Sequence, residues 1–382
     1  MGSRRGHGEG SIHQRKDGRW VATVELGFVN GKRRRKNVYG KTRKEVTTKL
    51  REVQQDLAQG LAVFTDDRRL DDFLTTWLDE VVAPSTKPRT LESYASVVRV
   101  HLIPSLGHHR LAALKPQHVQ ALLAEKSAAN LSPRTVRYIW QVLRRALNVA
   151  VKWGVLTHNI TNQVTPPRQP SKEVQPLSIE EVRRIINEAK GPRRYGAAMI
   201  LAVTTGMRRG EILGLQWSDI DLDADGGALL VVNRTVQRVD GQLVADEPKS
   251  SASRRTIVLG SEAAQALRRH RAAQAEERLR AGADWRGEDF VFTTATGGLV
   301  DGRNLLRSWK RLLKEVGIEE TRLHEARHTV ASLMLSAGVP IKTVQVTLGH
   351  SSIQMAADTY GHLMPDDSAR AAEAIDRMLK AN

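Results

Sequence analysis

The stretch HEARH, residues 324–328, contains two overlapping patterns that point to different chemistries. Read as H-E-x-x-H on a helix, His324 and His328 lie one turn apart and could share a Zn²⁺ ion, with Glu325 as a general base. Read as H-x-x-R, His324 and Arg327 combine an imidazole with a permanently charged guanidinium. The sequence on either side decides between the two patterns.

The zinc pattern lacks a third ligand. Its extended form needs Gly at position 331 and His at position 334, where the chain has Ala331 and Met334. A glutamate ligand downstream is also missing, because residues 326–372 contain no Glu. We therefore expect no bound metal, and we expect His328 to be a packed or hydrogen-bonded histidine.

Four further motifs accompany the H-x-x-R pattern. They are TGMRRGEILGLQW at 205–217, EPKSSASRRTIVL at 247–259, LGHSS at 348–352 and DTYGH at 358–362. Each polar residue in them has an ordinary structural role when taken singly: Arg208 could cap a helix, Lys249 could be a solvated loop charge, and Tyr360 could pack in a core. Their joint order along the chain is far more specific than any one of them.

In this order and spacing, residues 175–382 resemble the tyrosine recombinases, the phage integrase family. Matched position by position, the resemblance implies a catalytic set of Arg208, Lys249, His324, Arg327, His350 and Tyr360. It implies that Glu211 supports an arginine rather than taking part in the chemistry. The lysine position stays open, because the same segment also offers Arg254 and Arg255.

These residue types suit phosphodiester cleavage. Arg208 and Arg327 offer planar charged forks for the non-bridging oxygens, and His350 can add a donor to them. Such preorganised donors typically contribute about 3–4 kcal/mol each to the transition state. The resemblance implies the roles of the other residues. Tyr360 would be the nucleophile that forms a 3′-phosphotyrosine, Lys249 would donate a proton to the leaving 5′-oxygen, and His324 would act in acid–base transfer. Covalent storage of the bond energy requires no nucleotide, so we expect no cofactor.

Composition agrees with a nucleic-acid partner. Lys and Arg number 59 against 42 Asp and Glu, a net charge of +17 that favours binding to a polyanion. The chain has no cysteine, which excludes disulfides and thiol chemistry. No apolar run approaches the roughly 20 residues of a membrane span, and the first ten residues lack the apolar core of a secretory signal. We expect a location in the cytoplasm of a bacterial host.

Residues 1–65 form a basic front domain. They hold 15 Lys and Arg and 6 Asp and Glu, about half of the net charge. The D-G and N-G turns and an alternating strand predict a three-stranded sheet, followed by one helix with a Thr42–Glu45 capping box. The run Lys32, Arg33, Arg34, Arg35 and Lys36 is expected to contact DNA, although a charged sheet edge is the alternative. The domain loosely resembles the arm-binding domain of integrases.

The remaining chain divides at a proline-rich segment. Residues 66–160 predict three helices and a fourth that starts at Ser132-Pro133 and ends at Gly154. Arg134 and Arg137 on that helix are expected DNA contacts, with an ordinary solvated face as the alternative. Four prolines indicate a linker at 161–177. A mostly helical last domain, 178–382, opens with a Ser178–Glu181 capping box and has two short strands flanking a polar loop. The fold class is multidomain, mainly α with small β-sheets (α+β).

The resemblance implies double-stranded DNA as partner, with core and arm attachment sites, and a homo-tetramer assembled on it. An excisionase or a host DNA-bending protein is a further possible partner. The alternatives with the same chemistry are a chromosome-dimer-resolving or transposon-type recombinase and a type IB topoisomerase-like enzyme. A non-catalytic DNA-binding regulator is a fourth, and it fits the complete catalytic set poorly.

Overall fold

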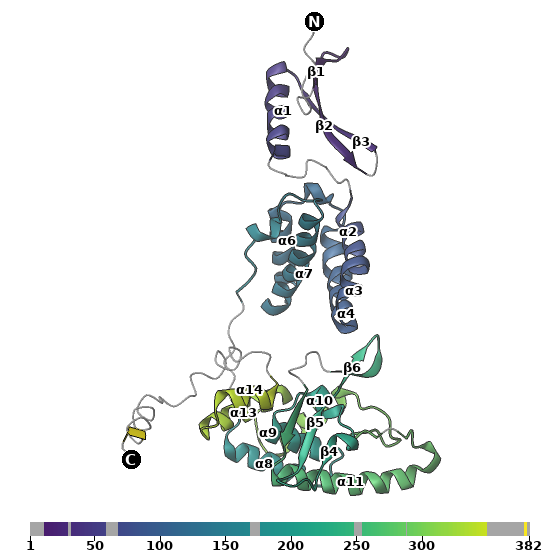
Figure 1. Cartoon of the computed structure of the whole chain (residues 1–382), viewed down its shortest axis with the longest axis vertical. Coiled ribbons are helices and arrows are strands. Elements are labelled where there is room, and N and C mark those ends of the chain that lie inside the picture. Colours follow the sequence, from purple (N-terminus) through teal and green to yellow (C-terminus); the bar gives the residue numbers. More distant parts are fainter. Residues whose placement is uncertain are drawn as a thin grey trace. The chain divides into compact units, whose positions relative to one another are not determined.

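The structure is a computed structural model. It describes residues 11–29, 32–58, 68–168, 176–247, 254–287, 289–349 and 378–379, and of residues 26–29, 32–34 and 56–58 the backbone alone. The chain divides into two compact units, Met1–Ser171 and Lys172–Asn382 (Figure 1). Both are mainly helical with small antiparallel sheets, which confirms the expected fold class. In the described part, no helix is long and apolar enough to cross a membrane.

The first unit begins with an antiparallel sheet of strands β1 (Ser11–Gln14), β2 (Trp20–Val29) and β3 (Lys32–Gly40) in that order. Helix α1 (Arg43–Ala58) packs Val46 and Leu50 against Ala22 and Val24 of β2. The expected capping contact is present, because the Glu45 backbone N–H donates to Thr42 Oγ1 over 3.2 Å. The predicted sheet-and-helix arrangement of the front domain is therefore confirmed.

The first unit continues as a helical bundle with its own core, which includes Phe73, Trp77 and Leu143. Its elements in chain order are α2 (Leu70–Trp77), η1 (Leu78–Val82), α3 (Ala83–Ser85), α4 (Pro88–Val97), η2 (Val98–Leu102), α5 (Ile103–Leu106), η3 (Leu111–Ala113), α6 (Pro116–Ala128), α7 (Pro133–Lys152) and η4 (Ile160–Gln163). Ile160 and Val164 belong to this core, so the packed structure continues past residue 160.

Two π-helical turns, η1 and η2, interrupt stretches that the sequence predicts as continuous α-helices. Each turn is followed within two residues by a proline, Pro84 or Pro104. A proline has no N–H, and its ring clashes with the carbonyl four residues earlier. A wider π turn accommodates both defects while the chain stays helical.

Helix α7 begins and ends where the sequence predicts. Ser132 is the N-cap, and its Oγ accepts a hydrogen bond from the Thr135 backbone N–H over 3.2 Å. Pro133 occupies the first helical position. Gly154, with φ of +70°, follows the last turn in the left-handed conformation that favours glycine.

The second unit surrounds a buried central helix, α9 (Gly196–Thr205), of whose ten residues nine are buried. Helices α8, α11 and α13 pack against it. The other elements are α8 (Ile179–Ala189), α10 (Arg209–Leu213), η5 (Trp217–Asp219), β4 (Ile220–Asp221), β5 (Leu229–Val232), β6 (Thr235–Val239), β7 (Gln242–Asp246), β8 (Arg255–Val258), α11 (Ser261–Ala281), η7 (Gly282–Asp284), α12 (Gly302–Glu315), α13 (Leu323–Ser336) and α14 (Ile341–Leu348). The Ser178–Glu181 capping box that opens α8 is confirmed.

The strands of the second unit form two sheets, β4-β5-β8 and the hairpin β6-β7 (Figure 1). The prediction of a polar loop between the two short strands is wrong where β6 and β7 lie. Asp240 and Gly241 both have positive φ, +46° and +77°, as in a tight two-residue hairpin turn. The D-G pair at 240–241 is the signal that predicts this hairpin.

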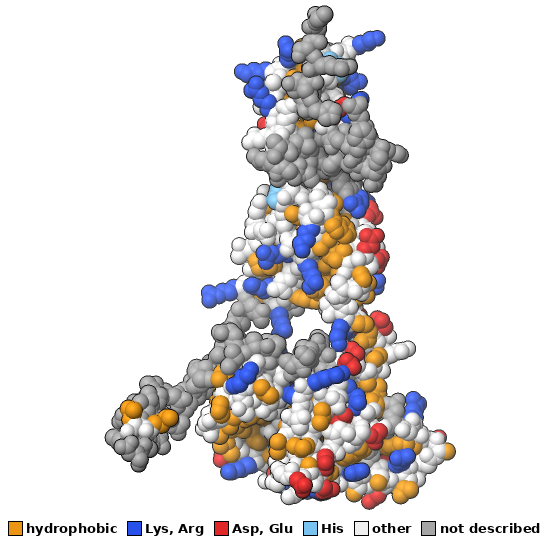
Figure 2. Space-filling model, viewed as in Figure 1, with side chains coloured by type: hydrophobic (Ala, Val, Ile, Leu, Met, Phe, Trp, Pro, Cys, Tyr) orange, Lys and Arg blue, Asp and Glu red, His pale blue; other side chains and the backbone are white. Residues whose placement is uncertain are grey.

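Charge is unevenly distributed on the surface of the helical bundle. Figure 2 shows Lys and Arg side chains on its visible face and acidic side chains along the edge that α2 and η1 form. The acidic side chains on these two elements are Asp71, Asp72, Asp79 and Glu80. Arg69 also lies at this edge, where its Nη2 pairs with Asp71 Oδ2 over 2.6 Å.

Candidate active site

Arg208 stands at the point where α9 ends and α10 begins. Gly206, with φ of +65°, turns the chain out of α9, and Arg208 is the N-cap of α10. Glu211, three residues on, accepts from the Arg208 backbone N–H over 2.9 Å and from its Nη1 over 2.7 Å. The Arg208 side chain is 39% exposed, so part of it is accessible to solvent.

Glu211 also pairs with a second arginine from another element. Arg255 on β8 donates from Nη2 to Glu211 Oε2 over 2.9 Å and from Nη1 to Oε1 over 3.3 Å. Both side chains are almost fully buried, 3% and 4% exposed. Burial opposes ionisation of Glu211, but the bonds and charge of Arg255, and then those of Arg208, outweigh it and hold its pKa below the usual range.

Helix α13 contributes His324, Arg327 and His328 from its first two turns. Arg327 is buried; its Nη1 donates to the Gly206 carbonyl over 2.9 Å, and its Nη2 donates to the Leu348 carbonyl. The rings of His324 and His328 meet edge to face with centroids 5.5 Å apart. Burial, then the charges of His328, Arg327 and Arg208, lowers the pKa of His324, so the imidazole is neutral at pH 7.

Glu325 takes no part in a metal site of the H-E-x-x-H kind. Its Oε2 accepts a hydrogen bond from the Arg322 backbone N–H over 2.8 Å, which caps the start of α13. Within the described ranges, no three His, Asp or Glu side chains are placed to hold a metal ion. In this structure Glu325 is therefore a helix cap.

The C-terminal end of α14 is where these arginines converge. The helix ends at Leu348, and Gly349 follows with φ of +65°. Arg255 Nε donates to the Thr347 carbonyl over 2.6 Å, Arg327 to the Leu348 carbonyl, and Arg208 Nη2 to the Gly349 carbonyl over 3.0 Å. We call Arg208, Arg255 and Arg327 the arginine cluster.

The structure thus brings together four of the residues that the sequence singles out: Arg208, Glu211, His324 and Arg327. Lys249, His350 and Tyr360 lie outside the described residues. Sequence reasoning missed the role of Arg255, which it offers only as an alternative to the lysine. The alternation of buried and exposed residues along β8 was the available signal, since it places Arg255 and Ile257 on the inner face.

The predicted DNA contacts lie on surface elements of the first unit. Lys32, Arg33, Arg34, Arg35 and Lys36 all belong to β3. Arg35 forms an exposed ion pair with Glu25 at 3.5 Å, a kind of contact that contributes little to stability.

On α7, Arg134 is exposed, and Arg137 lines a shallow pocket together with Trp140 and Arg144. The Arg144 guanidinium lies over the Trp140 ring, 5.2 Å from its centroid, and its Nε donates to Asn162 Oδ1 over 3.0 Å. Arg144 is therefore held in place by the fold, whereas Arg134 faces solvent.

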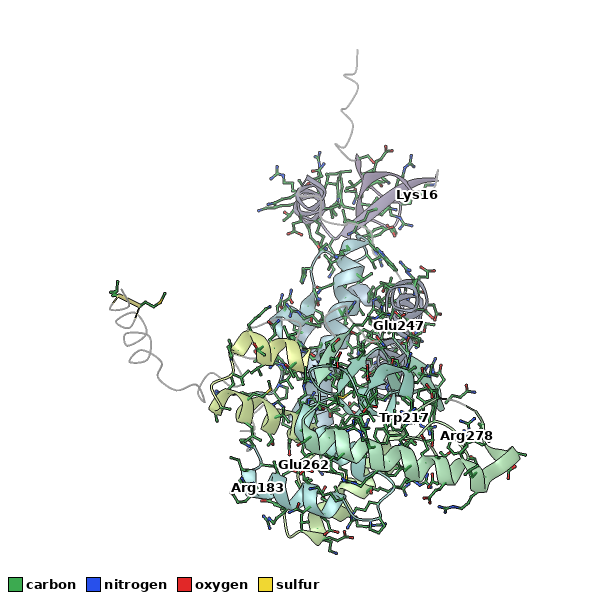
Figure 3. The ribbon with its side chains drawn as sticks, turned by 60° about the horizontal axis from the view of Figure 1, so that its bottom comes forward. Lys16, Arg183, Trp217, Glu247, Glu262 and Arg278 are labelled. Atoms are coloured by element: carbon green, nitrogen blue, oxygen red, sulfur yellow. The ribbon has the colours of Figure 1, made fainter. Side chains whose placement is uncertain are left out.

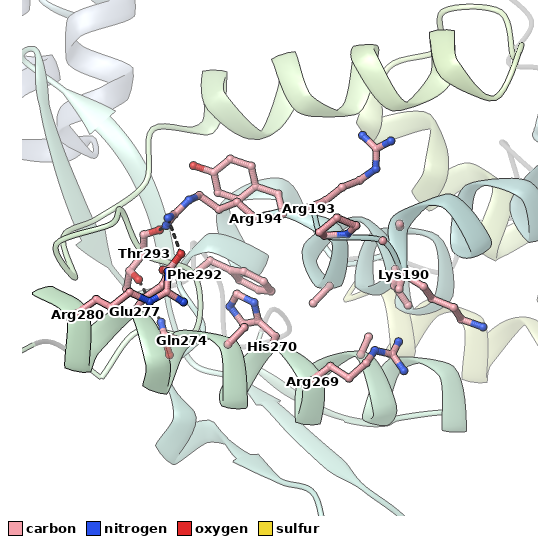
Figure 4. A pocket seen from close by; sticks show the side chains of 18 residues that line it. Lys190, Arg193, Arg194, Arg269, His270, Gln274, Glu277, Arg280, Phe292 and Thr293 are labelled. Carbon is pink, nitrogen blue, oxygen red and sulfur yellow. Dashed lines mark hydrogen bonds and ion pairs between the residues drawn. The ribbon is translucent and has the colours of Figure 1, made fainter.

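A cavity of about 530 Å³ lies apart from the arginine cluster, between the segment joining α8 to α9 and helix α11 (Figure 4). Tyr195, His270 and Phe292 are among the residues that line it. Arg194 and Glu277 form an ion pair at its edge, 2.6 Å between Nη2 and Oε1. The cavity borders the N-terminal half of α9, whereas the arginine cluster follows the C-terminal end of that helix, so it is not part of the candidate site.

Comparison with known proteins identifies the family. The description "Phage integrase family" matches residues 175–366, and "Phage integrase, N-terminal SAM-like domain" matches residues 69–127. The chain is 34% identical over 377 residues to a protein of Caldanaerobacter subterraneus subsp. tengcongensis named "Tyrosine recombinase XerC-like", covering 93% of this chain and 95% of that one. The chain belongs to the phage integrase family of tyrosine recombinases. It is a site-specific integrase, an enzyme that transfers DNA strands.

Further relatives include an integrase of Streptomyces ambofaciens, 31% identical over 372 residues and covering 94% of each chain. Among solved structures, the fold is similar to that of the Tn1549 transposon integrase in complex with a circular intermediate DNA, with a TM-score of 0.67 at 20% identity over 81% of this chain and 99% of that one. It is also similar to a lambda integrase dimer bound to a COC' core site, with a TM-score of 0.57 at 19% identity over 94% and 96%. At these identities the likeness shows the fold of the integrase.

Proposed function

We propose that the integrase cleaves and rejoins DNA through a 3′-phosphotyrosine, with Arg208, Lys249, His324, Arg327, His350 and Tyr360 as its catalytic set. The observation that carries this proposal is the arginine cluster. Two arginines of the set, Arg208 and Arg327, come from different elements and contact the two carbonyls that directly precede His350. The Arg208 side chain is 39% exposed, which leaves it accessible to a phosphate of the DNA.

In the proposed reaction, the Tyr360 oxygen attacks the scissile phosphorus, loses its proton, and forms a phosphotyrosine with the 3′ side of the DNA. The bond from phosphorus to the 5′-oxygen breaks, and Lys249 gives that oxygen a proton. The guanidinium groups of Arg208 and Arg327 stabilise the charge on the non-bridging oxygens. The neutral imidazole of His324 suits it to accept a proton near the tyrosine. Religation by a 5′-hydroxyl reverses the same steps.

We assign residues 1–65 to arm-site binding, 66–160 to core-site binding, 161–177 to a linker whose first residues, through Val164, still pack on the bundle, and 178–382 to catalysis. The DNA contacts would include Arg134 and Arg137 on α7 and the basic run on β3. A similar fold occurs in a lambda integrase tetramer bound to a Holliday junction, which supports a homo-tetramer on two core sites. An excisionase or host DNA-bending protein would set direction, and the enzyme would act on DNA in the cytoplasm of a bacterial host.

Integration and excision of a mobile element is the biological role that we propose. The name of the Caldanaerobacter relative favours a second candidate, a recombinase of the chromosome-dimer-resolving kind. A recombination assay separates them. An integrase joins two different attachment sites, whereas a resolving recombinase exchanges strands between two copies of one site.

The test of the chemistry is a suicide substrate, a core site nicked so that the 5′-hydroxyl diffuses away after cleavage. The wild-type integrase should accumulate a covalent adduct on a denaturing gel, and Tyr360→Phe should bind the same DNA and form none. An adduct that survives this substitution would place the nucleophile elsewhere. Tyr195 is a poor substitute, because burial raises the pKa of its hydroxyl.

A further inference from the structure

The end of α14 is capped by side chains from three separate elements. A helix leaves its last carbonyls without intrahelical donors, and here Thr347, Leu348 and Gly349 each receive a guanidinium. The arginines come from β8, from α13 and from the segment before α10. Three consecutive carbonyls are thus fixed to three parts of the unit, immediately before His350.

Arg255 differs from the other two arginines of the cluster in its lack of exposure. Its side chain is 3% exposed, whereas that of Arg208 is 39% exposed. Its hydrogen bonds include those to both oxygens of Glu211 and to the Thr347 carbonyl. A guanidinium held in this way has no open edge for a DNA phosphate. Arg255 therefore acts on the reaction through the groups that it holds.

The two groups that Arg255 holds, Glu211 and the Thr347 carbonyl, belong to two different parts of the candidate site. On one side, Glu211 binds Nη1 of Arg208 over 2.7 Å and orients its guanidinium. On the other side, Thr347 lies three residues before His350. Arg255 bonds to both Glu211 and the Thr347 carbonyl at the end of α14, and it does so from a buried position, whereas Arg208, which also contacts Glu211 and the end of α14, stays partly exposed.

The charges of the cluster make this link strong. Two guanidinium groups, those of Arg208 and Arg255, pair with one carboxylate, Glu211, and the Arg327 guanidinium donates to a carbonyl at the negative end of the α14 dipole. Buried charges are stable only where each is paired and hydrogen-bonded. A shift of any one partner would leave another unsatisfied, so the cluster resists small displacements.

We propose that Arg255 is a positioning residue for strand cleavage, which holds the guanidinium of Arg208 in register with the end of α14. The inference rests on the proposed function of Arg208 and His350. It adds a residue that contacts neither the phosphate nor the nucleophile. Because a displacement of about 1 Å can cost roughly 10²-fold in rate, loss of this link should slow chemistry while DNA binding is kept.

The variants Arg255→Lys and Arg255→Gln test the proposal in the full-length integrase. A lysine keeps the charge, but as a compact point charge it lacks the fork that spans Glu211 and Thr347. We expect the rate of adduct formation on the suicide substrate to fall roughly 10²-fold in both variants. The dissociation constant for core DNA should stay within about twofold, because Arg255 does not face solvent.

A matched control removes one positive charge elsewhere. Arg183 lies on α8 at the surface (Figure 3), with a side chain 72% exposed and a loose pair to Glu180 at 3.6 Å. Arg183→Gln should leave both the rate and the affinity unchanged. A wild-type rate in Arg255→Lys and Arg255→Gln would overturn the proposal. The proposal would also be overturned if both variants lost DNA binding and no longer showed a cooperative melting transition, because Arg255 would then be needed for folding rather than for positioning Arg208.

A sulfur substitution separates positioning from proton donation. A substrate with sulfur in place of the leaving 5′-oxygen needs no proton donor, because a thiolate is a good leaving group. Lys249→Ala should regain rate on this substrate, whereas Arg255→Lys should stay slow because the phosphate contacts remain displaced. Recovery of Arg255→Lys would instead make Arg255 the proton donor. An error in the proposed function itself would give a different result, because the covalent adduct would then still form with the Tyr360→Phe variant.

Discussion

At the scale of residues, the candidate site is a set of charges that compensate one another. Glu211 is buried between Arg208 and Arg255, and each of the three arginines also donates to a backbone carbonyl near the end of α14. Such a site has its donors in place before the substrate arrives, so little reorganisation is needed when charge develops on the phosphate.

The protonation state of His324 gives a prediction about pH. Its pKa is lowered first by burial and then by neighbouring positive charges, so the neutral form persists below the usual 6.5. The adduct-forming rate should therefore decline on acidification only below about pH 6.5. The free energy of unfolding should also fall as pH decreases through this range, because His324 binds a proton more readily in the unfolded chain than in the folded one. Rates measured from pH 5 to 8 check this, and an acid limb centred above pH 6.5 in wild type would contradict it.

A second residue-scale prediction concerns His328 and metal. Because Glu325 caps α13 and the sequence lacks the third ligand of the zinc pattern, we predict that a chelator has no effect on activity. Adduct formation should proceed in excess EDTA, and elemental analysis should find no stoichiometric zinc. Bound zinc that disappears together with activity in His328→Ala would restore the zinc interpretation of HEARH.

At the scale of elements, the junction of α9 with α14 sets the geometry of the site. Gly206 combines a φ of +65° with a close approach to α14, because a Cβ there would lie 2.6 Å from Leu348 Cδ2 and 3.3 Å from Val330 Cβ. Its carbonyl also accepts from Arg327. A single glycine thus lets the first motif approach the L-G-H motif.

Gly206→Ala should therefore cost more stability than backbone strain alone. Gly154 supplies the control, since it has φ of +70° and no atom within 4 Å of a Cβ. Gly154→Ala should cost about 1 kcal/mol from the left-handed backbone, and Gly206→Ala should cost several-fold more because Leu348 must move. Denaturant melts of both variants give the comparison. Equal losses in the two would mean that α14 adapts freely to the added methyl group.

Elements that depend on local chemistry could be predicted from the sequence. The caps at Ser132 and Ser178, the hairpin turn at Gly18 and the end of α7 at Gly154 each follow from one or two residues. The β6-β7 hairpin was missed although Asp240-Gly241 signals it, because the surrounding polar residues favoured a loop. The π turns before Pro84 and Pro104 depend on how a helix absorbs a proline within a packed bundle, which no local pattern specifies.

The members of the candidate site could be predicted from the sequence, but many of the contacts between them could not. Arg208, His324 and Arg327 follow from motif order, and the structure brings them together. The convergence of three arginines on consecutive carbonyls could not be predicted, because it joins Arg255 to residues 44 and 92 positions away. Tertiary contacts of this kind are fixed by packing around α9 rather than by the local sequence.

At the scale of the whole molecule, the basic front domain should bind DNA separately from the crossover site. Tethering makes the second contact intramolecular, so avidity can exceed a single affinity by roughly 10²–10⁴. Removing residues 1–65 should leave suicide-substrate cleavage nearly intact while integration between two attachment sites falls sharply. Unchanged integration, with no DNA preference shown by residues 1–65, would make the domain a merely basic module.

Salt dependence distinguishes how the basic strand β3 contacts DNA. If Lys32, Arg33 and Arg34 contact phosphates, their replacement by Ala should reduce the slope of the logarithm of the DNA-binding constant against the logarithm of the salt concentration by about 0.9 per lost contact. Base reading would instead weaken cognate DNA more than random DNA. Replacing Arg183, Arg268 and Arg280, which form exposed pairs in the second unit, removes the same charge and should leave the slope for arm DNA unchanged.

The central claim is that this integrase forms a covalent 3′-phosphotyrosine with the cleaved DNA at Tyr360. Mass spectrometry of the trapped adduct tests this claim most directly. The chain has five tyrosines, and trypsin places Tyr360 in the peptide 343–370, which contains no other. After nuclease digestion of the DNA, this peptide should carry a nucleotide linked through its 3′-phosphate to Tyr360. A nucleotide on any other peptide, or a phosphate joined to the 5′ side of the break, would contradict the account.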